Sequence, residues 1–202
     1  MDCPSNVLKL GLFSIQKRIE KISKTEKKMR TKVYFLMDTS GSMCCDDMKT
    51  FSDERMPTRL HVAHGAFNSL KQIVDELKDE DGCDVDSEAY AFADTCEQFF
   101  VGKEMPKLGG GTSFALAINH VVAQIEKDDP ANKRILVVIT DGEVGGDARA
   151  VEEKLSTIGQ DIRIVMIKIG ECRHQSHRMF RHNITSVDTA NTATYEAFEE
   201  AL

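Results

Sequence analysis

The chain has 202 residues, 41% of them hydrophobic, which is enough for one domain with a sizeable core. Its 33 acidic and 26 basic side chains give a net charge of −7, so we expect no nucleic-acid partner. The charge is uneven: residues 1–32 hold nine Lys/Arg and three Asp/Glu and carry +6, which leaves −13 for residues 33–202.

Residues 1–30 are predicted to form a basic amphipathic helical extension to a main domain over residues 31–202. Apolar residues recur there at three- and four-residue spacings, while Lys and Arg fill the other faces. The apolar positions are Leu8, Leu12, Ile15, Ile19, Ile22 and Met29. We expect this stripe to pack against the main domain or close it; a coiled coil or a membrane-surface helix is the alternative.

The same segment lacks the pattern of a signal peptide or a membrane span, because charges recur every few positions from Lys9 onward. We therefore expect a soluble, cytoplasmic protein with no membrane span. In a reducing compartment the six cysteines are predicted to be free thiols. They are Cys3, Cys44, Cys45, Cys83, Cys96 and Cys172.

The first strand is predicted over residues 33–37, a β-rich apolar run of the kind that helices cover on both faces. The strand ends in a tight turn with oxygen-bearing side chains at alternate positions, which are Asp38, Ser40 and Ser42. A helical pattern follows over residues 59–77.

The middle of the chain combines a predicted hairpin with a glycine-rich loop. Residues 88–94 and 97–101 are predicted to pair and to supply an antiparallel edge to the sheet. The run Gly109-Gly110-Gly111 then ends at Thr112, and a helical pattern follows over residues 113–126.

The last third repeats the alternation of strand and helix. A buried-type strand over residues 135–139 runs into Thr140-Asp141-Gly142-Glu143. A helix over 147–158, strands over 162–167 and 184–187, and a final helix over 194–202 follow. Alternating β and α segments predict an α/β fold, a doubly wound, mostly parallel, Rossmann-like sheet flanked by helices.

Three of these loops should open at the same edge of the sheet, because they follow neighbouring parallel strands at their carboxyl ends. Their hydroxyl and carboxylate oxygens suit a hard cation such as Mg²⁺, which requires near-octahedral oxygen coordination. A dication held mostly by neutral hydroxyls and waters keeps enough charge to attract an outside carboxylate. The pattern therefore indicates a site that binds rather than catalyses.

The order Asp38-x-Ser40-x-Ser42, then Thr112, then Asp141 in a Thr-Asp-Gly sequence resembles the metal-ion-dependent adhesion site (MIDAS) of von Willebrand factor A (VWA) domains. The resemblance covers roughly residues 31–200 and fills all five positions. It implies that Ser40 and Ser42 coordinate the metal directly and that Thr112 does so directly or through water. Asp38 and Asp141 are then expected to act largely through waters or to switch roles.

The resemblance further implies a protein–protein interaction module rather than an enzyme. The expected cation is Mg²⁺, with Mn²⁺ or Ca²⁺ as alternatives, and it would receive a Glu or Asp of a protein partner. Small intracellular members of the family resemble adaptors of ATPases or stress-response complexes, in the manner of tellurium-resistance-associated VWA proteins. Extra carboxylates at Asp46 or Asp47 would favour Ca²⁺.

Two other functions stay open. The chain would be a structural or assembly protein if the N-terminal helix drives oligomerisation, or a metal-dependent phosphoester hydrolase if the same site turns over a substrate. Other enzyme classes fit poorly, because Ser40 stands where an aspartyl phosphotransferase needs a second carboxylate and lies outside a Gly-x-Ser-x-Gly elbow. No Gly-Lys-Ser/Thr follows the glycine run, which disfavours a phosphate loop.

Three further Cys/His groups receive ordinary interpretations. The stretch with Cys172, His174, His177 and His182 is interpreted as a solvated loop rather than a zinc site. His61 and His64 are interpreted as helix-surface and helix-core residues. The segment Cys44-Cys45-Asp46-Asp47 is interpreted as a variable loop near the metal rather than a metal or redox site.

Overall fold

The computed structural model describes residues 30–48, 57–78, 84–99, 110–142, 148–158, 162–170, 182–184 and 196. In chain order these contain β1 (Thr31–Asp38), the short 3-10 helix η1 (Gly41–Cys44), α2 (Arg59–Lys78), β2 (Val85–Phe92), β3 (Cys96–Phe99), α3 (Phe114–Ile125), β4 (Lys133–Thr140), α4 (Ala148–Ile158), β5 (Arg163–Ile169) and β6 (His182–Ile184). The predicted N-terminal helix lies outside the described residues, as does the predicted C-terminal helix apart from Glu196.

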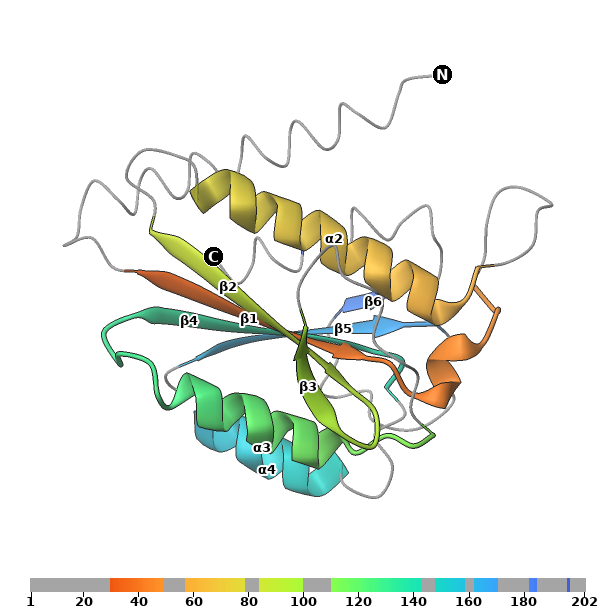
Figure 1. Cartoon of the computed structure of the whole chain (residues 1–202). Coiled ribbons are helices and arrows are strands. Elements are labelled where there is room, and N and C mark those ends of the chain that lie inside the picture. The colour runs from red at the N-terminus through yellow and green to blue at the C-terminus, as the bar shows by residue number, and fades with distance from the viewer. Residues whose placement is uncertain are drawn as a thin grey trace.

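Within these ranges the strands form one sheet in the order β3-β2-β1-β4-β5-β6. β3 runs antiparallel to β2, and every other neighbouring pair is parallel. Helix α2 covers one face of the sheet, and α3 and α4 cover the other (Figure 1). From β1 the chain first adds β2 on one side and later β4 on the other. The carboxyl ends of β1 and β4 therefore flank the switch point, where ligands bind in open α/β sheets.

The strands are buried on both faces, as their uninterrupted apolar runs predicted. Val33, Phe35 and Met37 of β1 pack with α2 in one core cluster, whereas Tyr34 and Leu36 pack with α3 and α4 in a second. Packing on both faces fixes the position of β1 and therefore of the turn that follows it.

The structure confirms the predicted doubly wound α/β fold, with strand and helix bounds within one or two residues for β4, β5, α2, α3 and α4. The predicted hairpin is also present, but β2 begins earlier and pairs in parallel with β1, so only β3 forms the antiparallel edge. β6 covers residues 182–184, and residues 185–187 of the predicted last strand lie outside the described ranges. No helix in the described ranges is long and apolar enough to cross a bilayer.

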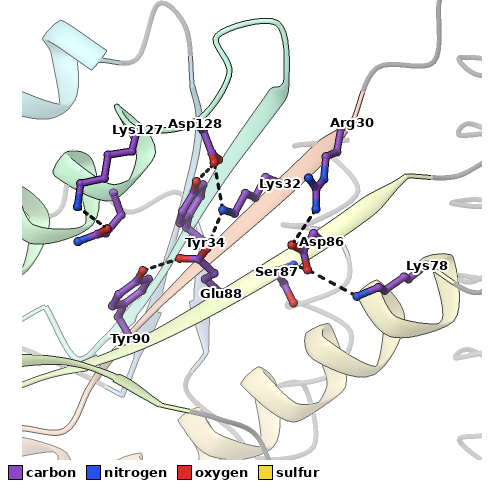
Figure 2. Close-up of polar contacts among 11 residues, drawn as sticks. Arg30, Lys32, Tyr34, Lys78, Asp86, Ser87, Glu88, Tyr90, Lys127 and Asp128 are labelled. Atoms are coloured by element: carbon purple, nitrogen blue, oxygen red, sulfur yellow. Dashed lines mark hydrogen bonds and ion pairs between the residues drawn. The ribbon is translucent and has the colours of Figure 1, made fainter.

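A polar network closes the end of the sheet where β1 begins (Figure 2). The Lys32 ammonium lies 2.6 Å from a Glu88 carboxylate oxygen and 3.1 Å from one of Asp128. The Tyr34 hydroxyl donates to Asp128, and the Tyr90 hydroxyl donates to Glu88 over 2.5 Å. These contacts fasten the loop between α3 and β4 to β1 and β2, at the opposite end of β1 from Asp38.

Candidate metal centre

Asp38, the last residue of β1, is fully buried and held by hydrogen bonds from Ser40 and Thr140. Its Oδ1 accepts the Ser40 backbone N–H over 2.8 Å, and its Oδ2 accepts the Thr140 hydroxyl over 2.5 Å. The first bond shapes the turn after β1, and the second joins the carboxyl ends of β1 and β4. The carboxylate therefore has a fixed orientation at the switch point.

The turn after Asp38 brings Ser40 and Ser42 together, with their Oγ atoms 3.1 Å apart. Adjacent ligands of an octahedral ion at 2.0–2.1 Å are separated by about 2.8–3.0 Å, and at calcium distances by about 3.3–3.7 Å. The two hydroxyls, which bond to one another in this structure, have a separation between these two ranges, close to that of neighbouring ligands of one dication. The donor set fits such an ion.

Asp141 follows β4 directly, and its side chain has no exposed surface. Its Oδ2 accepts a hydrogen bond from Arg59 Nη1 over 3.0 Å. Arg59 also pairs with Asp47, whose Oδ2 lies 2.6 Å from Nη2. The sequence reasoning missed Arg59, although a cation in the first turn of a helix, against the helix dipole, was a signal that could have pointed to it.

Thr112 is half-buried in the loop before α3, and that loop is anchored to the turn after β2. The Gly110 and Gly111 backbone N–H groups donate to the two Asp94 carboxylate oxygens over 3.1 and 3.0 Å. The Ser113 N–H donates to the Ala93 carbonyl over 2.8 Å. This anchoring positions Thr112 relative to β2, the neighbour of β1 in the sheet. Sequence reasoning also missed the part played by Asp94.

The structure joins some predicted site residues directly and others through intermediates. Hydrogen bonds connect Asp38, Ser40 and Ser42 with one another. Asp141 is linked to this group through its chain neighbour Thr140, and Thr112 through the contacts that hold its loop to the end of β2. All five residues belong to loops or strand ends on the side of the sheet where the parallel strands have their carboxyl ends.

No protein-family model and no curated protein matches the chain, but solved structures do. A von Willebrand factor type A protein from Catenulispora acidiphila aligns with a TM-score of 0.61 and 15% identity, over 86% of this chain and 43% of that one. An aerotolerance-related membrane protein from Bacteroides fragilis aligns with a TM-score of 0.60 and 20% identity, over 85% and 98%. The chain has the von Willebrand factor A fold.

A third VWA-like neighbour is proximal thread matrix protein 1 of the mussel byssus, described with a zinc-occupied MIDAS motif. It aligns with a TM-score of 0.58 and 13% identity, over 86% of this chain and 46% of that one. The chain thus spans less than half of the mussel and Catenulispora proteins and nearly all of the Bacteroides chain. At these identities the likeness establishes the VWA fold alone.

The electrostatics at the carboxyl ends of these strands involve three aspartates, two of which, Asp47 and Asp141, pair with Arg59. Burial raises the pKa of Asp38 to about 6, although hydrogen bonds from Ser40 and Thr140 oppose the shift. Hydrogen bonds from Arg59 lower the pKa of Asp47, and the two aspartates Asp47 and Asp141 raise the pKa of Arg59. When all four groups are ionised, the negative charges outnumber the positive one by two.

The other candidate metal groups have ordinary environments or lie outside the described ranges. Across all the described residues, with Asp38, Asp47 and Asp141 included, no group of three or more His, Cys, Asp and Glu side chains is arranged to hold a metal. His61 is exposed, and His64 is half-buried beside Asn68, with ring nitrogen and amide nitrogen 3.2 Å apart. Cys44 and Cys45 are exposed free thiols. The stretch from Cys172 to His177 lies outside the described residues.

Proposed function

We propose that the ends of β1 and β4 and the loop before α3, together the metal edge, bind a divalent cation, with Mg²⁺ as the expected ion. Through this cation the metal edge would bind a carboxylate of a protein partner. The observation that carries this proposal is the 3.1 Å spacing of the Ser40 and Ser42 hydroxyls on a turn ordered by Asp38. In it, Ser40 and Ser42 bind the ion directly. Thr112, Asp38 and Asp141 complete the site directly or through water.

Binding rather than catalysis follows from the chemistry of these ligands. Hydroxyls neutralise none of the charge of a dication, so the ion keeps its attraction for a Glu or Asp that supplies a missing oxygen. The mussel neighbour with zinc in its MIDAS motif supports the idea that this fold accommodates a divalent ion at such a site.

The test is a pull-down from source-cell lysate with wild type and the Ser40→Ala/Ser42→Ala variant, each with Mg²⁺ and with chelator. A partner retained only by wild type with Mg²⁺ would support metal-bridged recognition and would reveal whether that partner belongs to an ATPase or a stress-response complex. Ser87→Ala, in β2 away from the metal edge, is the matched control and should behave as wild type. A partner retained in all samples would contradict the proposal and direct attention to residues 1–30.

A further inference from the structure

Arg59 reaches the metal edge from the first turn of α2. Its backbone N–H donates to the Cys45 carbonyl over 2.9 Å, so the start of α2 is tied to the loop after η1. Its side chain, only 7% exposed, extends from there to the end of β4. The guanidinium places Nη1 3.0 Å from Asp141 and Nη2 2.6 Å from Asp47. Arg59 thus joins two loops of the metal edge.

The end of β5 leaves room for this side chain. Gly170 follows β5 with a φ of +83°, and a Cβ atom there would lie 2.7 Å from Arg59 Nε and 3.1 Å from Arg59 Cδ. Any other residue at position 170 would therefore displace Arg59 as well as strain the backbone. The course of the Arg59 side chain depends on three separate elements, α2, β4 and β5.

We propose that Arg59 is a resident counter-cation of the metal centre, which keeps Asp141 from coordinating the ion directly and lowers the affinity of the site for a dication. This inference rests on the metal-binding function proposed above. It assigns to Arg59 a positioning and charge-setting role that the five MIDAS-like residues do not include.

The charges around the site explain the consequence for partner recognition. Asp141 is wholly buried, so its charge acts strongly on a nearby ion unless Arg59 offsets it. Asp47, the second partner of Arg59, has a side chain that is 41% exposed and therefore screened by water. With Asp141 engaged by Arg59, an ion held by the Ser40 and Ser42 hydroxyls keeps more of its charge for an outside carboxylate. Arg59 thus lowers the affinity of the site for the ion and strengthens the attraction of the bound ion for an acidic partner.

Titration of the full chain with Mn²⁺ alone, followed by electron paramagnetic resonance of the free ion, tests the inference. Arg59→Gln removes the counter-cation, and we expect Mn²⁺ affinity to rise at least about tenfold, because a positive charge repels a nearby dication appreciably even at an effective dielectric constant near 20. Arg30→Gln removes the same charge at the opposite end of β1 and should leave the affinity within about twofold of wild type.

A second variant controls for the change in net charge. Arg59→Gln/Asp47→Asn removes one positive and one negative charge, so its net charge equals that of wild type and Asp47 is not left without its counter-ion. Because Asp47 is screened and Asp141 is not, the double variant should still bind Mn²⁺ more tightly than wild type. Equal or weaker binding by the folded Arg59 variants would overturn the inference.

Ser40→Ala separates this inference from the function on which it rests. If wild type binds Mn²⁺ no better than Ser40→Ala, the proposed metal site itself fails. If wild type binds in a Ser40-dependent way and the Arg59 variants do not bind more tightly, the site stands and the role of Arg59 falls.

Discussion

Asp38 shows how the burial of a single carboxylate at the proposed binding site affects the stability of the fold. Burial raises its pKa from 3.8 to about 6, so the folded protein holds this proton more tightly than the unfolded chain does. The resulting contribution to stability is fully present below about pH 4 and is lost as the pH rises through about 6. Near neutral pH without metal, the buried carboxylate is therefore a destabilising group, and a bound cation would relieve this cost.

Asp38→Asn should stabilise the metal-free protein at pH 8 while removing cation binding. We expect the free energy of unfolding to rise by about 1–3 kcal/mol, because each pKa unit corresponds to about 1.4 kcal/mol and the weakened bond from Thr140 offsets part of the gain. Urea denaturation in chelator at pH 8 and pH 4.5 measures it, and the gain should shrink at the lower pH. Asp75→Asn, on the exposed side of α2, is the control. An equal change at both pH values would contradict the assignment.

Two adjacent glycines provide a matched test of the loop that carries Thr112. A Cβ atom on Gly111 would lie 2.4 Å from Asp94 Oδ1, whereas one on Gly110 would lie 3.5 Å from Asp94 Oδ2, an ordinary contact. Gly111→Ala should therefore separate the loop from the β2–β3 turn, cost about 1–3 kcal/mol of stability and weaken Mn²⁺ binding. Gly110→Ala should change stability by less than about 0.5 kcal/mol. Similar effects of the two substitutions on unfolding and Mn²⁺ titration would show that Asp94 does not position Thr112.

At the scale of elements, Phe67 joins α2 to the sheet through two aromatic contacts. Phe67 is fully buried, with its ring 5.3 Å from that of Phe35 in β1 and 5.2 Å from that of Phe99 in β3. Phe67→Ala should lower the free energy of unfolding by about 3–5 kcal/mol, which urea denaturation measures. The exposed neighbour Asn68 provides the control, since Asn68→Ala should have a small effect. A loss below about 1 kcal/mol for Phe67→Ala would contradict this view of the core.

The elements were predictable from the sequence because each has its own local pattern. The run 33–37 is apolar on both faces, and residues 59–77 repeat at helical spacing, so β1 and α2 follow from periodicity alone. The Asp38–Ser40–Ser42 turn was also accessible, because its residues are close in the chain. The contact between Arg59 and Asp141 spans 82 positions and that between Asp94 and Gly111 spans 17. Such contacts arise from the packing of whole elements, which no local pattern records.

At the scale of the whole molecule, the metal edge joins loops that are distant in the chain, so an ion bound there should stabilise the fold as a unit. A ligand that binds only the folded state adds about 2.7 kcal/mol at one hundred times its dissociation constant. We expect the thermal midpoint of wild type to rise with increasing Mg²⁺, and that of Ser40→Ala/Ser42→Ala to stay constant. Ser87→Ala should follow wild type. An equal rise in both proteins would indicate that Mg²⁺ acts elsewhere on the chain.

The closed polar network at the start of β1 gives the domain a geometric polarity. Arg30 pairs with Asp84 before β2 and Lys32 with Asp128 before β4, whereas Asp38 ends β1 at the metal edge. Seven residue steps separate Thr31 from Asp38, which corresponds to about 23 Å along an extended strand. A shortened chain that begins at Arg30 could be attached to a sensor surface by its amino terminus. It would then be held at the end of β1 opposite the proposed cation site. The metal edge would then face away from the sensor surface, which leaves it accessible when the binding of a large acidic partner is measured.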